Sequence, residues 1–279
     1  MHFLTLITRC KDEPYMEEFV KYYISEGVER IHILDDNSII PFSKYVLEHP
    51  NVKIHKSNGN FKKDQMEDAQ KLYSRIRNNS KWFIFVDCDE FITTRKNLNN
   101  TIVDELKTKF KNADCIKVPW IMMSCNGIEN DPNSLLEDLT YRWNHDLKHI
   151  HPNNWVKGRC RYDKIEVKCI FKGKKFNNLS MHIPLEPIGD INCVNSINCN
   201  KSIVSFFYNN LREKDINVAR LICHHYRIIS KESCLRKIKT SNLSGYNCDV
   251  ENLLICDYPE IIDETLKIKF INKIKKVEN

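Results

Sequence analysis

The strongest constraint on the fold is a regular alternation of apolar, β-rich segments with helical segments over the first third of the chain. Strands are expected at residues 2–8, 30–34, 52–55 and 81–86, and helices at 14–26, 41–48 and 64–77. Strands that alternate with helices of this length form βαβ crossovers, which place the strands parallel in one sheet. We therefore predict an α/β fold with a mostly parallel central sheet flanked by helices.

Polar clusters follow three of these strands, at residues 8–13, 35–38 and 87–90. In doubly wound sheets, ligands bind beyond the carboxyl ends of the strands. The three clusters are far apart in the sequence, but the predicted topology brings them to one edge of the sheet. This convergence is the first indication of a binding site.

Asp87 and Asp89 are the most informative pair in these clusters. They follow the apolar run Trp82–Val86 directly, and two carboxylates at this spacing suit a hard divalent ion such as Mg²⁺ or Mn²⁺. The alternative is a solvated acidic turn, because Asp-x-Asp is a short and common pattern. The position between a buried strand and the apolar pair Phe91-Ile92 favours the metal site.

A second informative segment runs from Leu221 to Lys237. Adjacent histidines, His224 and His225, follow an apolar run, and Ser230 and several basic residues come after them. A neutral imidazole is a good ligand for manganese or a donor to a phosphate. A single histidine is more often a hydrogen-bonded core residue, but the basic residues favour a functional interpretation.

Other candidates are weaker when taken alone. Asp36 could accept hydrogen bonds from ribose hydroxyls, although Asp35 to Ser38 would also suit an Asx turn or a helix cap. Arg9 could face phosphates, and Glu13 could reach a base or serve only as first-turn helix charge. Trp120 could stack on a sugar ring, although core packing is the commoner role of tryptophan.

Beyond residue 94 the pattern is less regular. We expect helices at 102–110, 202–212 and 231–240, and strands at 115–122, 165–171 and 183–185. The histidines 145, 149 and 151 lack the carboxylate or cysteine partners of a zinc site. We interpret them as part of a surface loop.

Composition restricts the partners and the compartment. The formal charge is +6, from 43 basic and 37 acidic residues, which is an ordinary solubilising excess and gives no reason to expect a nucleic-acid partner. The N-terminus lacks the features of a signal peptide, and no segment reaches the roughly 18 apolar residues of a membrane span. None of the 12 cysteines forms a C-x-x-C pair. We therefore predict a cytoplasmic protein with mostly reduced, buried cysteines and no transmembrane segment.

These segments together resemble GT-A-fold glycosyltransferases of the family 2 and family 92 (DUF23-like) type. The similar blocks occur in the family's order over residues 3–240, with Met123-Ser124 in place of its usual Phe-Gly pair. The blocks are Thr8–Glu13, Glu18–Tyr23, Ile33–Ser38, Gln65, Trp82–Phe91, Val118–Gly127, Lys168, His182 and His225–Lys237. The resemblance implies a GT-A-like fold and a metal-dependent transfer of sugar from a nucleotide-sugar donor, usually a UDP-sugar, to a hydroxyl acceptor on a glycan, protein or lipid.

The resemblance also implies residue roles. Asp87, Asp89 and His225 would hold Mn²⁺ or Mg²⁺. The donor would be bound by Arg9, Glu13, Asp36, Gln65, Lys168, Ser230 and Lys237. Transfer with inversion needs a carboxylate base near the acceptor, for which Glu137 and Asp138 are the candidates, with Asp131 behind them. We expect one domain over residues 1–279, with a donor half at 1–94, an acceptor half at 95–240 and a helical extension at 241–279.

Two other functions stay open. A nucleotidyltransferase or other phosphoryl-transfer enzyme can also place Asp-x-Asp and a metal on an α/β sheet. It would need a Gly-rich phosphate loop near the first strand, yet the chain has only 7 glycines and none before Gly27. A non-catalytic nucleotide-sugar-binding protein is the third possibility, which the complete Asp-x-Asp and His-Tyr segments disfavour.

Overall fold

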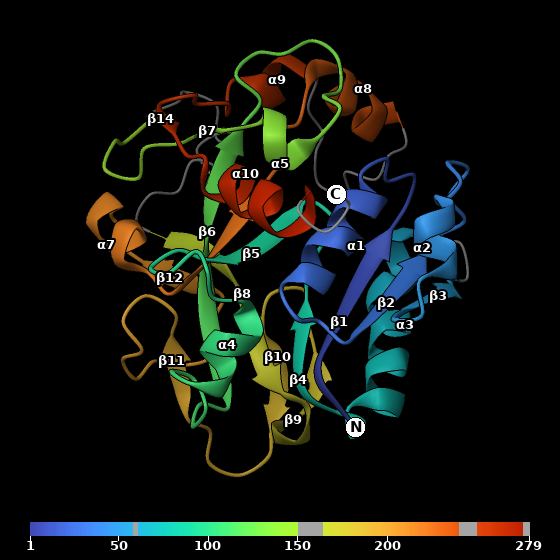
Figure 1. Cartoon of the computed structure of the whole chain (residues 1–279), viewed down its shortest axis with the longest axis vertical. Coiled ribbons are helices and arrows are strands. Elements are labelled where there is room, and N and C mark those ends of the chain that lie inside the picture. The colour runs from blue at the N-terminus through green and yellow to red at the C-terminus, as the bar shows by residue number, and fades with distance from the viewer. Residues whose placement is uncertain (58–60, 150–163, 240–249, 276–279) are drawn as a thin grey trace.

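The computed structural model describes residues 1–57, 61–149, 164–239 and 250–275 (Figure 1). The strands are β1 (His2–Cys10), β2 (Arg30–Asp35), β3 (Val52–Lys56), β4 (Ser80–Phe85), β5 (Glu90–Thr94), β6 (Cys115–Ser124), β7 (Tyr141–Arg142), β8 (Lys164–Lys172), β9 (Phe176–Leu179), β10 (Pro184–Pro187), β11 (Cys193–Asn195), β12 (Phe207–Asn209), β13 (Leu221–His225) and β14 (Ile261–Ile262). The helices are α1 (Met16–Ser25), α2 (Lys44–Glu48), α3 (Phe61–Ile76), α4 (Ile102–Lys107), α5 (Leu135–Asp138), α7 (Glu213–Val218), α8 (Lys231–Lys239), α9 (Val250–Leu254) and α10 (Thr265–Phe270), with the short helices η1 (Gly173–Lys175) and η2 (Ile271–Lys275).

The central sheet is mixed, so the prediction of a mostly parallel sheet was wrong. Its main order is β14-β7-β6-β8-β4-β1-β2-β3, with β5, β11, β12 and β13 joined at the side. The pairs β3-β2, β2-β1 and β1-β4 are parallel, as expected from the helices that connect them. Strand β8 lies antiparallel between β4 and β6. Strand β7 pairs antiparallel with β6, and β5 pairs antiparallel with β13. The prediction failed because it extended the βαβ rule of the first 86 residues to segments without crossover helices.

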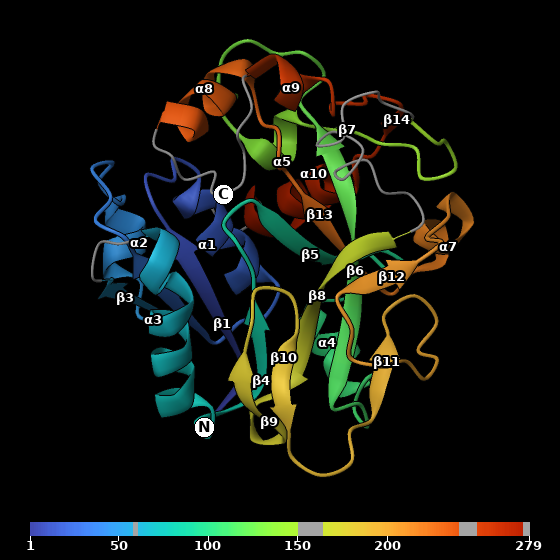
Figure 2. The ribbon, with the colours of Figure 1, turned by 180° about the vertical axis from the view of Figure 1, so that it is seen from behind.

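Helices α1 and α3 cover opposite faces of the parallel strands (Figures 1 and 2). Successive side chains of β4 pack into two different hydrophobic cores, because neighbouring residues of a strand point to opposite faces of the sheet. Trp82 and Ile84 join the core that contains Phe19 of α1. Phe83 joins the other core with Tyr73 of α3. Because β4 is buried on both of its faces, its residues form a continuous apolar run that stops just before Asp87.

The segment expected to be helical at 202–212 contains strand β12 instead. Phe207 to Asn209 pair antiparallel with Glu166 to Lys164 of β8. The buried Lys117 of β6 also donates to the Ser205 hydroxyl at 2.7 Å and to the Phe207 carbonyl at 2.8 Å, which holds this backbone extended. These contacts are distant in sequence, so the local pattern could not predict them.

The C-terminal segment packs onto the end of α1. Glu26 is fully buried, and its carboxylate lies 2.7 Å from the Lys269 amine and 3.0 Å from the Lys273 amine. The same carboxylate accepts a hydrogen bond from the Ile102 amide at the start of α4. Residues 250–275 are not purely helical, because β14 pairs with β7.

Ten cysteines lie in the described ranges, and all of them are free thiols. Nine are buried and Cys199 is half-buried, which confirms the expectation of cysteines as small core residues. In the part of the chain that the structure describes, no helix is long and apolar enough to cross a membrane.

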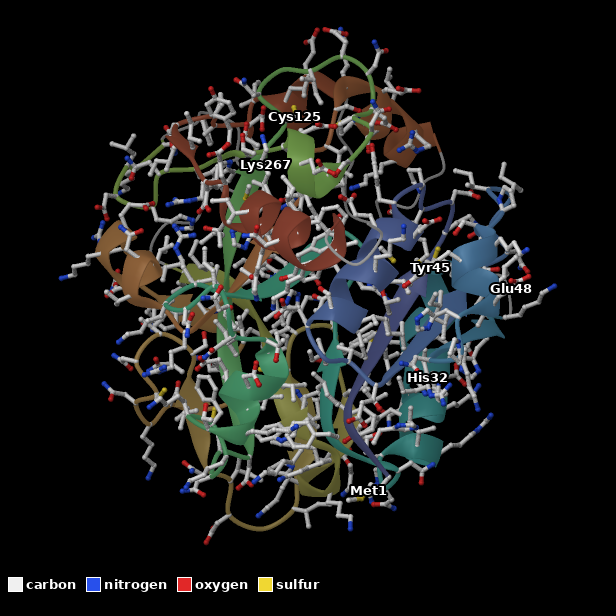
Figure 3. All side chains as sticks on the ribbon, in the orientation of Figure 1. Met1, His32, Tyr45, Glu48, Cys125 and Lys267 are labelled. Carbon is white, nitrogen blue, oxygen red and sulfur yellow. The ribbon has the colours of Figure 1, made fainter. Side chains whose placement is uncertain are left out.

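A histidine pair on β2 and β3, of which His32 is buried and His55 half-buried, predicts acid sensitivity (Figure 3 labels His32). His32 Nδ1 lies 2.8 Å from His55 Nε2, and burial and the His55 ring lower the pKa of His32 to about 3. The unfolded chain, with an ordinary histidine pKa near 6.5, binds protons that the folded chain excludes. The stabilisation of the fold by the neutral His32 ring is therefore present above about pH 6.5 and is lost as the pH falls. We expect His32→Phe to reduce the loss of unfolding free energy between pH 7 and pH 5 by roughly 2 kcal/mol, measured by urea denaturation.

The control for this experiment is His2→Phe, because the His2 side chain is 37% exposed. This variant is expected to change the pH dependence much less. An unchanged difference between pH 7 and pH 5 in His32→Phe would refute the assignment.

Candidate functional site

The turn after β4 is pinned against the end of β1. The Val86 amide donates to the Ile7 carbonyl at 3.3 Å, and the Cys88 thiol donates to the Arg9 carbonyl at 3.0 Å. The Cys88 sulfur also lies 3.3 Å from the Thr8 hydroxyl. The first and third polar clusters of the sequence therefore meet at the carboxyl edge, as predicted.

Asp87 is held by two cations. Its Oδ1 lies 2.7 Å from Arg9 Nη2, and its Oδ2 lies 3.2 Å from Lys168 Nζ. Burial would raise the pKa of Asp87, but attraction to Arg9 and Lys168 holds it well below its ordinary value. Asp87 is therefore a permanently charged carboxylate with both oxygens engaged.

Glu90 completes this group, and sequence reasoning assigned it no role. Its carboxylate is fully buried, accepts the Asp87 amide at 2.7 Å and lies 2.9 Å from the Lys168 amine. Burial alone would lower the pKa of Lys168, but Asp87 and Glu90 raise it above its ordinary value. The available signal was an acidic residue directly before the apolar pair Phe91-Ile92.

Asp89 faces a different set of partners. Its Oδ1 lies 3.7 Å from His225 Nε2 at the end of β13, and its Oδ2 lies 3.2 Å from Lys237 Nζ on α8. The Asp89 carbonyl accepts the Tyr226 amide at 2.8 Å, which joins the turn to β13. Burial lowers the pKa of His225 to about 3, so its imidazole is neutral.

These residues fit a metal ion only in part. In the described residues, no group of three or more histidine, cysteine, aspartate or glutamate side chains is arranged to hold a metal. Asp89 and His225 provide one carboxylate and one neutral imidazole on the same side. Two protein ligands, completed by phosphate oxygens and water, are what Mg²⁺ or Mn²⁺ needs in a substrate complex. Asp87 faces Arg9 and Lys168 instead.

A cleft near Asp89 contains two of the predicted donor-binding residues, Glu13 and Lys237. Lys11, Glu13, Arg236 and Lys237 are among the residues that line it, and its volume is about 40 Å³. Burial raises the pKa of Glu13 to about 7, and its carboxylate accepts the Tyr15 amide at 3.1 Å. The edge of the sheet therefore combines three basic side chains with a carboxyl group that can carry a proton.

Asp36 lies next to this cleft, at the end of β2. Its Oδ2 lies 3.3 Å from the amine of Lys11, and its side chain is 2% exposed. Its Oδ1 is buried and has no hydrogen-bond partner among the described residues. Asp35, in contrast, accepts the Ser38 amide in the turn that the sequence suggested as an alternative. The unpaired oxygen makes Asp36 the better candidate for a ligand contact.

Ser230 is placed at the start of α8. Its hydroxyl accepts the Ser233 amide at 2.8 Å, which caps the helix, and it donates to the carboxylate of Asp131. Asp131 is also 2.6 Å from Arg236. Ser230 therefore positions α8 and, through it, the basic residues of the cleft.

The two candidate bases lie in the short helix α5. The Glu137 amide donates to the Ser134 hydroxyl at 3.0 Å, and the Asp138 carboxylate accepts the Ser134 amide at 3.0 Å. Glu18 of α1 accepts the Leu135 amide of the same helix. These hydrogen bonds hold the turn itself, so a base at Glu137 or Asp138 stays a prediction.

Some sequence candidates cannot be placed. Gln65 belongs to α3, but its side chain lies outside the described part of the chain, and so do His151 and Trp155.

The two adjacent histidines of β13 point to opposite sides. His225 faces Asp89, whereas His224 is fully buried with its Nε2 3.8 Å from Asp263 Oδ1. Asp263 also accepts from Arg142 at 2.8 Å and from Arg95 at 2.6 Å. The sequence grouped the histidines as one candidate site, but the alternation of a strand gives only one of them to the edge.

The family model Glycosyltransferase family 92 matches residues 12–252. No curated protein matches the chain in sequence. Among solved structures, HddC from Yersinia pseudotuberculosis is similar at 10% identity and a TM-score of 0.36, over 78% of this chain and 98% of that one. The same protein complexed with GMP-PN gives 9% identity and a TM-score of 0.34, with the same coverage.

Proposed function

The chain belongs to glycosyltransferase family 92 and is a glycosyltransferase, and we propose that it transfers sugar from a UDP-sugar to a hydroxyl acceptor with inversion. The observation that carries this proposal is the meeting of Asp89, His225 and Lys237 beside the basic cleft. A nucleoside diphosphate is the leaving group of such a reaction, and its negative charge is complementary to Lys11, Arg236 and Lys237 of the cleft. The family membership itself implies a nucleotide-sugar donor and an acceptor.

Residues in and beside the cleft account for each part of the nucleotide. Lys237, Arg236 and Lys11 bind the diphosphate, and entry of the donor separates Lys237 from Asp89, because the cleft is too small for a nucleotide sugar. Asp36 accepts a ribose hydroxyl through its unpaired oxygen, and Glu13 contacts the base.

Asp89 and His225 would hold Mn²⁺ or Mg²⁺, which when bound neutralises the charge that develops on the departing diphosphate. Arg9 and Lys168 keep Asp87 charged and fixed, so that the turn carrying Asp89 is preorganised before the donor arrives.

Thermal unfolding with UDP and Mn²⁺ tests this proposal. At about 100 times its dissociation constant, a ligand that binds only the folded state adds about 2.7 kcal/mol. For a chain of this length we expect the midpoint to rise by roughly 5–10 °C. The rise should shrink in EDTA and should be smaller with UMP, which lacks the second phosphate.

Turnover then separates the remaining functions. A panel of nucleotide sugars with Mn²⁺ should release a nucleoside diphosphate. Release of pyrophosphate would indicate nucleotidyl transfer instead, and binding without any turnover would indicate a non-catalytic protein. If no donor is consumed and no nucleoside diphosphate stabilises the chain, the proposed function is wrong.

A further inference from the structure

Trp120 of β6 lies beside the charged cluster with a polar group that the interactions above do not use. Its ring centroid is 4.2 Å from that of His225 and 5.2 Å from that of His182, and the Lys168 amine lies 5.8 Å from it. The side chain is 7% exposed, yet its indole N–H has no hydrogen-bond partner in the described ranges. Buried donors are almost always paired, so this N–H is suited to donate to a bound ligand.

His182 has a defined tautomer. Its Nδ1 lies 3.1 Å from the Val167 carbonyl, which can only accept, so Nδ1 carries the hydrogen and Nε2 keeps a lone pair. Burial and the Lys168 ammonium lower the pKa of His182, against the opposing effect of Glu166 and Asp87. The half-buried imidazole is therefore neutral near pH 7, with a basic nitrogen available.

Phe206 extends this surface into solvent. It is 43% exposed, and its ring lies 5.8 Å from the His182 ring. The Val167 amide donates to the Phe206 carbonyl at 3.1 Å, so Val167 of β8 is hydrogen-bonded both to the Phe206 backbone and to the His182 ring. Met181, 39% exposed, immediately precedes His182. An exposed aromatic ring with a buried N–H and an imidazole beside it suits the apolar face and the hydroxyl groups of a pyranose.

We propose that Trp120, His182 and Phe206 form the acceptor subsite for a sugar hydroxyl and that His182 Nε2 is the base of the transfer. This inference rests on the proposed function. The Trp120 N–H donates to the acceptor sugar, and the Phe206 ring packs on its apolar face. The acceptor O–H proton passes to Nε2 while its oxygen forms the new bond to the anomeric carbon. The bond from that carbon to the diphosphate oxygen breaks, and its electron pair leaves with the nucleoside diphosphate.

The test uses His182→Asn, whose amide can still donate to the Val167 carbonyl but cannot accept a proton. Turnover of the UDP-sugar selected by the donor panel is measured with methyl glycosides as acceptors, by UDP release. A general base contributes about 10²- to 10⁴-fold, so kcat should fall by this factor. The wild-type rate should decline at acidic pH as His182 is protonated, and this decline should be absent in the variant. His182→Gln serves as the second variant if the first is unstable.

Phe206→Ala, at an exposed position, should raise KM for the methyl glycoside at least tenfold with a smaller effect on kcat. Binding gives a readout without turnover. Calorimetric titration of methyl glycosides into the UDP- and Mn²⁺-loaded protein should show weaker binding in Phe206→Ala and in Trp120→Phe.

The outcomes separate the two proposals. If UDP stabilises His182→Asn as it does the wild type, and kcat is unchanged, the acceptor subsite is wrong while the proposed function stands. The same conclusion follows if Glu137→Gln or Asp138→Asn, rather than His182→Asn, removes the acidic decline, or if neither binding variant weakens glycoside binding. If UDP does not stabilise the wild type and no donor is consumed, the proposed function itself fails.

Discussion

Replacing Asp89 by asparagine is expected to lower kcat by about 10²- to 10³-fold, the size of effect seen when one preorganised electrostatic contact to a developing charge is lost. The amide keeps the shape of the side chain but removes the charge that faces His225 and Lys237. The Mn²⁺-dependent part of the stabilisation by UDP should decrease in parallel. Donor turnover and thermal unfolding with and without Mn²⁺ measure the two effects.

Asp190→Asn is the matched control, because it makes the same chemical change at an exposed position. Asp87→Asn is a less suitable comparison, since it leaves Arg9 and the buried Lys168 with less compensating charge and should also destabilise the fold. If Asp89→Asn retains full turnover and the same response to Mn²⁺, the assignment of the metal and diphosphate pole to Asp89 is wrong.

The parallel half of the sheet was predictable because its signals are local. Strands β1, β2 and β4 are largely buried, and β1, β2 and β3 are each followed by a helix, so the apolar runs and their spacing determine both type and direction. Strand β8 was expected at residues 165–171, but its antiparallel direction had no local signal, and strand β12 lies where a helix was expected. Their pairing depends on contacts distant in sequence, such as those from Lys117 to Ser205 and Phe207. Tertiary contacts of this kind override local propensity.

The candidate site also has features that were predictable from the sequence and features that were not. The meeting of Arg9 and Asp87 at one edge follows from topology, whereas only the resemblance to a known family placed His225 at the same site. The sequence could not show that Asp87 and Asp89 have different roles, because only the folded turn directs the two carboxylates to different partners. It could not separate His224 from His225 without knowing which face of β13 is covered.

The cluster around Asp263 predicts the largest effect on stability. The Asp263 side chain is 1% exposed and pairs with Arg142 of β7 and with Arg95 after β5, while His224 lies nearby on β13. Arg142 also makes two hydrogen bonds, at 2.8 and 2.7 Å, to Glu213 of α7. Removing one partner of a buried ion pair costs about 3–5 kcal/mol, because the remaining charge is left buried. We expect Asp263→Asn to lower the unfolding free energy at pH 7 by this amount, measured as a lower urea midpoint with an unchanged slope.

The pH dependence of that loss identifies its cause. Although burial opposes its charge, His224 and Arg95 hold the pKa of Asp263 well below its ordinary value. The stabilisation is therefore complete above the unfolded pKa of about 3.9 and is lost as the pH falls towards the folded pKa. Asp263→Asn should lose less stability than the wild type between pH 5 and pH 3, whereas Asp190→Asn should follow the wild type. If Asp263→Asn does not fold, Arg95→Ala, which removes a partner that is 14% exposed, gives a smaller loss with the same pH signature. Equal urea midpoints for Asp263→Asn and the wild type would show that the cluster contributes no net stability, and that other contacts hold β13 and thereby His225 in place.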